Sequence, residues 1–328
     1  MPSAASSSAM NDQPPPWEGP LQILSLDGGG LKGLFQAAML ARFERDLETR
    51  IVNHFDLIVG TSTGGLIALG LGAGVPLSAM VDFYVRLGPQ VFKTGALRSA
   101  RRLVRAKHSA KHLRGALEEV FQTRLLGQSG KRLVIPSYSL DDDDVYLFKT
   151  PHHTKLKRDG QVRMVDVALA TSAAPTYLPA ARVGNQRLID GGVWANNPTF
   201  VGVAEAVSML GASLDQIRVL SLGTTDPVAS RPGKLDHGGF LQWGLPATSL
   251  ILRAQALGTF HASEHLLGQV GRLTRIDPVV EHGLFDLDKL DPVRIQGLAE
   301  TVSRKCNPQV EEFTKHQAAP YVPTGKVR

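Results

Sequence analysis

The sequence has almost no cysteine and no long apolar run. Cys306 is the only cysteine in 328 residues, which excludes an intrachain disulfide and fits a reducing, intracellular location. The most apolar stretch, residues 66–81, is short and interrupted by glycine and proline, so it does not predict a membrane-spanning helix. Residues 1–20 have neither a basic start nor an apolar core and are expected to form a disordered tail, not a signal peptide. Any action on a membrane would therefore take place at its surface.

Acidic residues are absent from residues 83–117, although the whole chain has 36 Lys and Arg against 30 Asp and Glu. The basic residues of this stretch, which we call the basic segment (residues 86–114), are Arg86, Lys93, Arg98, Arg101, Arg102, Arg105, Lys107, Lys111 and Arg114. Such a segment can meet anionic lipid head groups, a nucleotide or nucleic acid, or it can be a solvated helical face. The sequence leaves these alternatives open.

The chain has the composition of an ordinary globular protein, with 43% hydrophobic and 20% charged residues. From residue 21 onwards, strand-like apolar runs alternate with runs of helical periodicity. Strands are expected at residues 21–26, 55–59, 133–140, 145–149 and 217–222, and helices at residues 35–51, from about residue 64, and at residues 77–121, 166–174 and 199–210. This order predicts an α/β fold, with a mainly parallel sheet covered by helices. Residues 227–328 show no clear linker, so we expect a single domain over residues 21–328.

Two glycine-rich turns each follow an apolar strand and lead into a helix. The turn at residues 60–64 has the G-x-S-x-G pattern of a nucleophile elbow around Ser62. Gly60 and Gly64 are needed there because the backbone of such an elbow comes so close that side chains would clash. The other turn carries Gly28, Gly29, Gly30 and Gly33, and backbone N–H groups around its glycines can stabilise an oxyanion. The two turns predict a serine nucleophile beside an oxyanion hole.

A serine nucleophile needs a base to accept its proton. Ten histidines are present, but none lies in a motif that distinguishes it from the others. Asp190 instead ends a short apolar run and is followed by Gly191 and Gly192, which allow a tight turn that points the carboxylate into a site. Alone this would be an ordinary Asp-Gly turn. Beside the two glycine-rich turns, Asp190 becomes a candidate base.

Two other interpretations of these motifs are weaker. The first turn also fits the G-x-G-x-x-G pattern of dinucleotide-binding folds, but Asp27 directly before it is poorly placed beside a pyrophosphate. That interpretation also leaves the second turn unexplained. Four consecutive aspartates at residues 141–144 suggest calcium, but their spacing is not that of an EF-hand loop. We interpret them as a charged hairpin turn.

Together, the motifs resemble those of the patatin-like phospholipase family. The resemblance rests on residues 27–33, 60–65, 168–177 and 190–192, in this order and at family-like spacing, and covers about residues 21–226. It implies a three-layer fold and a dyad of Ser62 and Asp190 without histidine, with the loop of residues 28–33 as oxyanion hole. It also implies hydrolysis of lipid acyl esters through an acyl-enzyme, without a metal or other cofactor.

Residues 27–35 and 53–60, with the Gly-Thr-Thr ending at Thr225, are more narrowly similar to patatin-like effectors of bacterial antiphage (CBASS) systems. This likeness implies membrane phospholipids as substrates, a cyclic dinucleotide as activator, and a cytoplasmic protein that lies at the inner face of the membrane when active. We expect no nucleic acid polymer as partner, and an oligomer stays open. Two alternatives remain: an esterase acting on soluble esters, and a lipid-binding module without catalysis.

Overall fold

The fold is built around a central mixed sheet. The computed structural model describes residues 14–91, 110–227, 233, 236–237, 239–268, 271–280 and 291–324. The strands of the sheet are β1 (Leu21–Leu26), β2 (Leu57–Gly60), β3 (Arg132–Ser139), β4 (Asp144–Lys149), β5 (Ala181–Val183), β6 (Gln186–Asp190), β7 (Ile217–Leu222) and β9 (Leu273–Ile276). The order is β5-β6-β3-β2-β1-β7-β9, and β4 pairs with β3 beside this path. Two short strands, β8 (Asp226–Pro227) and β10 (Val279–Val280), pair separately.

Parallel pairing dominates the centre of the sheet. β1 lies between β2 and β7, β2 pairs with β3, and β7 pairs with β9, all in parallel. β4 and β6 run antiparallel to β3, and β5 runs antiparallel to β6. β6 pairs with β3 only near the carboxyl end of β3, where its last residue, Asp190, lies opposite Ser137. Because this overlap is short, Asp190 stays close to the edge of the sheet where β2 ends at Gly60.

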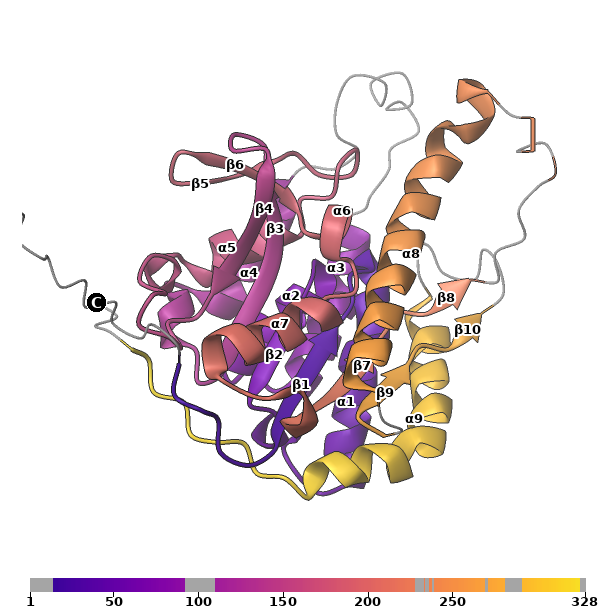
Figure 1. Cartoon of the computed structure of the whole chain (residues 1–328). Helices are drawn as coiled ribbons and strands as arrows, with labels where there is room; N and C mark the ends of the chain where they lie inside the picture. Colours follow the sequence, from indigo (N-terminus) through magenta and orange to yellow (C-terminus); the bar gives the residue numbers. More distant parts are fainter. Residues whose placement is uncertain are drawn as a thin grey trace, which may run out of the picture.

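Helices cover both faces of the sheet, which confirms the predicted α/β architecture (Figure 1). The helices are α1 (Gly33–Asp46), α2 (Thr63–Gly72), α3 (Leu77–Val91), α4 (Ala110–Phe121), α5 (Met164–Thr171), α6 (Gly192–Ala195), α7 (Thr199–Leu210), α8 (Phe240–Leu267) and α9 (Pro292–Thr314). Strand side chains alternate between the two faces. Leu24 and Leu26 pack with α1 and α2, whereas Leu21 and Ile23 pack with α7 on the other face.

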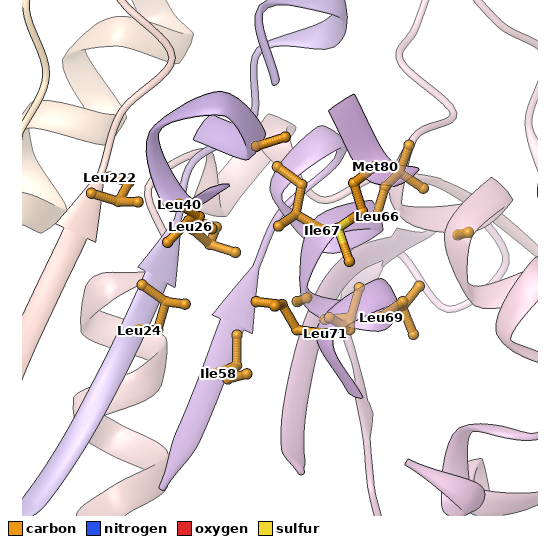
Figure 2. Packing of buried hydrophobic residues seen from close by; sticks show 14 of the residues in the cluster. Leu24, Leu26, Leu40, Ile58, Leu66, Ile67, Leu69, Leu71, Met80 and Leu222 are labelled. Atoms are coloured by element: carbon orange, nitrogen blue, oxygen red, sulfur yellow. The ribbon is translucent and has the colours of Figure 1, made fainter. Parts of the chain in front are cut away.

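The helix α2 is buried along its whole length, as its lack of charge predicts. Figure 2 shows Ile67 and the leucines of α2 in one cluster with the sheet residues Leu26 and Ile58 and the side chain of Met80 from α3. A Cβ atom at Gly70 would lie 2.2 Å from Cε of Met80, so a larger residue there would require the Met80 side chain to move. The start of α2, directly after the second glycine-rich turn, is therefore held firmly by the core.

Three expectations about the chain's organisation need correction. The helix expected at residues 35–51 ends at Asp46, and Ile51 begins a separate 3-10 turn while remaining buried. The tail expected at residues 1–20 is too long at its C-terminal end, because the Trp17 N–H donates to the carbonyl oxygen of Gly211. No helix was predicted within residues 227–328, which contain the long helices α8 and α9. Tertiary packing stabilises these helices more than local sequence does.

The aspartates at residues 141–143 lie in the turn between β3 and β4, as expected for a charged hairpin turn, and Asp144 is the first residue of β4. Asp141 pairs with Arg187, and Asp143 accepts a hydrogen bond from Tyr138. No group of three or more metal-ligating side chains occurs in the described ranges. Within the same ranges, no helix is long and apolar enough to cross a membrane.

Most of the basic segment, residues 92–109, lies outside the described residues. At its edges, Arg86 and Lys111 are exposed. Arg114 forms an ion pair with Asp166 at 3.0 Å and lies 3.8 Å from Glu118. At least at Arg114, the positive charge is therefore partly neutralised within the helical layer.

Candidate active site

Ser62 sits at a sharp turn between β2 and α2. Its φ of 54° and ψ of −120° place a non-glycine residue in a strained conformation of the kind that clusters at active sites. A Cβ atom at Gly60 would lie 2.3 Å from the carbonyl oxygen of Gly64, and one at Gly64 would lie 2.2 Å from that of Leu26. Both glycines are therefore required by close backbone approach, as the elbow pattern predicts.

The structure brings Ser62 and Asp190 together although 128 residues separate them. The Ser62 hydroxyl donates to Oδ2 of Asp190 at 2.7 Å. The other carboxylate oxygen, Oδ1, accepts the backbone N–H of Gly192 at 2.7 Å. Both side chains are buried, with 9% and 5% of their residue surfaces exposed. Each carboxylate oxygen thus has its own donor, which fixes the orientation of Asp190 toward the serine.

Residues 168–177 hold both members of this pair in place. The Thr171 hydroxyl accepts the backbone N–H of Ser62 at 2.9 Å and donates to the carbonyl oxygen of Pro136 at 2.6 Å. Two residues later, the carbonyl oxygen of Ala173 accepts the backbone N–H of Asp190 at 3.1 Å. The sequence alone does not indicate this role of Thr171, because its hydrogen-bond partners are distant in sequence. One short motif therefore fixes the backbone of both Ser62 and Asp190.

The four glycines of the first turn have different surroundings. The Gly28 N–H donates to the carbonyl oxygen of Asn196 at 2.9 Å, and the Gly33 N–H donates within the turn. A Cβ atom at Gly33 would lie 1.9 Å from Oγ1 of Thr63, so Gly33 permits close packing against the elbow. The N–H groups of Gly29 and Gly30 have no acceptor in the described part of the chain. These two amides are the ones available to an oxyanion.

Burial raises the pKa of Asp190 from its usual 3.8 to about 6, although the hydrogen bonds from Ser62 and Gly192 act in the opposite direction. A carboxylate with this pKa is still ionised at neutral pH and accepts a proton more readily than an exposed aspartate. Hydrogen bonds link neither Ser62 nor Asp190 to a histidine within the described ranges. The site therefore offers a carboxylate as the neighbouring base.

The raised pKa of Asp190 leads to a pH prediction. The base form is the ionised carboxylate, so kcat/KM for ester hydrolysis should fall by about tenfold per pH unit below about pH 6 and level off above it. The measurement is a pH profile of fatty acid release by the full-length protein. An acid limb near pH 4 would show that the Asp190 carboxylate titrates like an exposed aspartate, contrary to its burial.

A hydroxyl at a strained elbow, a buried carboxylate within hydrogen-bond distance and free amides nearby have the arrangement of a serine hydrolase site. The model of the patatin-like phospholipase family matches residues 24–202. The chain belongs to this family, which confirms the resemblance of its motifs. It is accordingly an enzyme of the lipid acyl hydrolase class.

Several curated proteins are similar over most of their length. A cGAMP-activated phospholipase of Pseudomonas aeruginosa is 34% identical, with 90% of this chain and 92% of that protein covered. A cGAMP-activated phospholipase of Vibrio cholerae is 32% identical, with coverage of 91% and 93%. Patatin-like protein 2 of Arabidopsis thaliana is 33% identical, with 71% of this chain and 66% of that protein covered. Among solved structures, VipD from Legionella pneumophila matches with a TM-score of 0.49 and 13% identity, covering 91% of this chain and 67% of that one.

Proposed function

We propose that this protein hydrolyses acyl esters of membrane phospholipids with Ser62 as nucleophile and Asp190 as general base. The observation that carries the proposal is the buried hydrogen bond of 2.7 Å from the Ser62 hydroxyl to the Asp190 carboxylate. Membership of the chain in a phospholipase family also supports the proposal. No residue outside this pair is needed to move the proton.

The reaction proceeds in two steps. Asp190 accepts the proton of Ser62 as the serine oxygen attacks the ester carbonyl, and the N–H groups of Gly29 and Gly30 stabilise the tetrahedral oxyanion. Return of the proton to the leaving oxygen releases a lysolipid and leaves an acyl-enzyme. Asp190 then takes a proton from water, which attacks the acyl group and regenerates Ser62. The atoms balance as one water consumed for each fatty acid released.

The weakness of an aspartate as a base for an alcohol is the main physical difficulty. A pKa raised to about 6 reduces the mismatch, and a single oxyanion donor contributes about 10²- to 10³-fold in rate. Two free amides at Gly29 and Gly30 therefore provide a large part of the rate enhancement. The burial of both side chains strengthens each of these interactions because water is excluded.

We further propose that a cyclic dinucleotide activates the enzyme, which then acts from the surface of the membrane in antiviral defence. The support is the likeness over about nine-tenths of the chain to proteins named cGAMP-activated phospholipase. The basic segment has the charge to meet the phosphates of a nucleotide or of lipid head groups. An oligomeric active form stays open.

Lipid mass spectrometry on vesicles tests both parts of the proposal. Vesicles of phosphatidylethanolamine and phosphatidylglycerol are incubated with the full-length protein, with and without cGAMP, and with a short soluble ester in parallel. We expect lysophospholipid and free fatty acid to appear with cGAMP and to be scarce without it. Equal hydrolysis in both samples would refute the activation, and a preference for the soluble ester would favour the alternative of a soluble-ester esterase. Lipid binding without any product would favour the non-catalytic lipid-binding module.

A further inference from the structure

Asp27, the residue directly before the first glycine-rich turn, is buried and paired with an arginine from the far end of the chain. Nη1 of Arg275 donates to Oδ1 of Asp27 at 2.9 Å, and Nη2 donates to Oδ2 at 2.6 Å. This is the bidentate geometry that fixes a carboxylate most firmly. Arg275 lies on β9, outside the residues 24–202 that the family model matches.

The guanidinium of Arg275 also binds a second carboxylate, that of Asp277, which directly follows the end of β9. Nη2 of Arg275 donates to Oδ2 of Asp277 at 2.7 Å, and Oδ1 of Asp277 accepts the Thr225 N–H at 3.1 Å. Thr225 has a φ of 80°, a left-handed conformation that a β-branched residue rarely adopts. The backbone of this turn after β7 is therefore held in a strained shape from the β9 side.

The turn at Thr224 and Thr225, which Asp277 holds, packs against the glycine loop. The Thr224 hydroxyl donates to the carbonyl oxygen of Gly28 at 3.2 Å, and a Cβ atom at Gly29 would lie 2.1 Å from this hydroxyl oxygen. Nζ of Lys32 donates to the carbonyl oxygen of Thr225 at 3.0 Å. Arg275 thus contacts the beginning of the glycine loop through Asp27, and its middle through Asp277 and the turn at Thr224 and Thr225.

We propose that Arg275 is a positioning residue that sets the direction of the Gly29 and Gly30 amides toward the oxyanion. Its hydrogen bonds do not reach Ser62, and it acts through Asp27 and Asp277. The inference rests on the proposed hydrolytic function. A buried ion pair contributes little net stability compared with apolar packing, so the value of this one lies in the geometry that it imposes. A shift of about 1 Å in an oxyanion donor is enough to cost about 100-fold in rate.

The two variants Arg275→Lys and Asp277→Asn test this role. Lysine keeps the positive charge but cannot donate two parallel hydrogen bonds to Asp27. Asp277→Asn keeps the pair of Arg275 and Asp27 but weakens the links of residue 277 to Arg275 and to Thr225, so it serves if Arg275→Lys fails to fold. The matched control is Arg272→Lys, because Arg272 directly precedes β9 and donates to the carbonyl oxygen of Leu214, away from the glycine loop.

The assay uses the full-length protein with cGAMP on phosphatidylethanolamine and phosphatidylglycerol vesicles. It measures kcat and KM for fatty acid release, the inhibition constant of an alkyl trifluoromethyl ketone, and the thermal unfolding midpoint. The ketone forms a hemiketal oxyanion with a serine hydroxyl, so its affinity reports on the oxyanion hole. For Arg275→Lys we expect kcat to fall by about 100-fold with KM within about twofold, and ketone affinity to fall in parallel. For Asp277→Asn we expect a fall of about tenfold in both, and for Arg272→Lys no change.

A wild-type kcat and ketone affinity in Arg275→Lys would overturn the inference, as would a lowered unfolding midpoint with unchanged kcat. If Arg275→Lys does not fold, wild-type values in Asp277→Asn overturn it. A wild-type protein that neither hydrolyses lipid nor binds the ketone refutes the proposed function itself, and the inference fails with it. An active wild type with unaffected variants refutes the inference alone.

Discussion

Replacement of Ser62 by alanine is expected to abolish lipid hydrolysis while the protein stays folded. Without the hydroxyl no acyl-enzyme can form, and loss of a serine nucleophile in other hydrolases costs about 10⁴-fold or more. The Cβ atom of alanine fits the elbow as that of serine does, so the packing of α2 is kept. The measurement is release of fatty acid from vesicles together with labelling by an alkyl fluorophosphonate, which reacts covalently with activated serines. Both should disappear in Ser62→Ala.

The matched control for this variant is Ser172→Ala. Ser172 is buried within the motif that holds the dyad, and its hydroxyl has no hydrogen-bond partner in the described part of the chain. Loss of that hydroxyl should leave both hydrolysis and labelling unchanged. Residual hydrolysis above about one thousandth of wild type in Ser62→Ala would contradict the assignment of the nucleophile. Equal losses in both variants would indicate a structural effect instead.

Where local pattern and tertiary packing agree, the sequence alone predicted the structure well. β1, β7 and α7 have the bounds that their apolar patterns indicate. The proximity of Ser62 and Asp190 was expected from the resemblance of their motifs to those of the patatin-like family, and the two side chains form a hydrogen bond. Each of these elements combines a strong local signal with a buried position, so nothing in the fold opposes the local preference.

Elements fixed by distant contacts could not be predicted in this way. Pro308 lies inside α9, and proline in a sequence normally argues against a helix. α9 forms nevertheless because Ile295, Val310 and Phe313 are buried in the same core as α1. Arg275 lies on a four-residue strand and meets a carboxylate 248 positions away. No local pattern links these two residues, so the pairing of Arg275 with Asp27 could not be predicted before the fold was known.

Replacement of Asp190 by asparagine is expected to abolish hydrolysis and to stabilise the protein at neutral pH. The amide cannot accept the proton of Ser62, and loss of such a carboxylate costs about 10⁴-fold in rate. Asparagine keeps the shape of aspartate: its Oδ1 can still accept the Gly192 N–H, and its amide can donate to the Ser62 oxygen. The site therefore stays filled and hydrogen-bonded while its charge is removed.

The gain in stability follows from the pKa of Asp190, which burial raises from 3.8 to about 6. The folded protein binds this proton more tightly than the unfolded chain does, so the free energy of unfolding falls as the pH rises from about 4 to about 6 and stays at its lowered value above pH 6. At pH 7.5 the cost is about 3 kcal/mol at most, since one pKa unit corresponds to about 1.4 kcal/mol. Below about pH 4 the carboxyl is protonated in both states, and the cost vanishes. Urea unfolding of Asp190→Asn should show a higher midpoint than wild type at pH 7.5 and little difference at pH 4.

Asp56→Asn separates this effect from a general effect of replacing a buried aspartate. Asp56 lies at the opposite end of the parallel strands, where Oδ1 accepts the Ala319 N–H at 2.6 Å and Oδ2 accepts from His316 at 2.8 Å. Its loss should lower the free energy of unfolding by about 1 to 3 kcal/mol and leave kcat unchanged, because it contacts no part of the site. The two aspartates thus have opposite expected effects: one stabilises the fold, and the other is retained at a cost in stability because the reaction needs its charge. Measurable hydrolysis in Asp190→Asn, or a loss of stability at pH 7.5, would show that Asp190 serves the fold and that the base lies elsewhere.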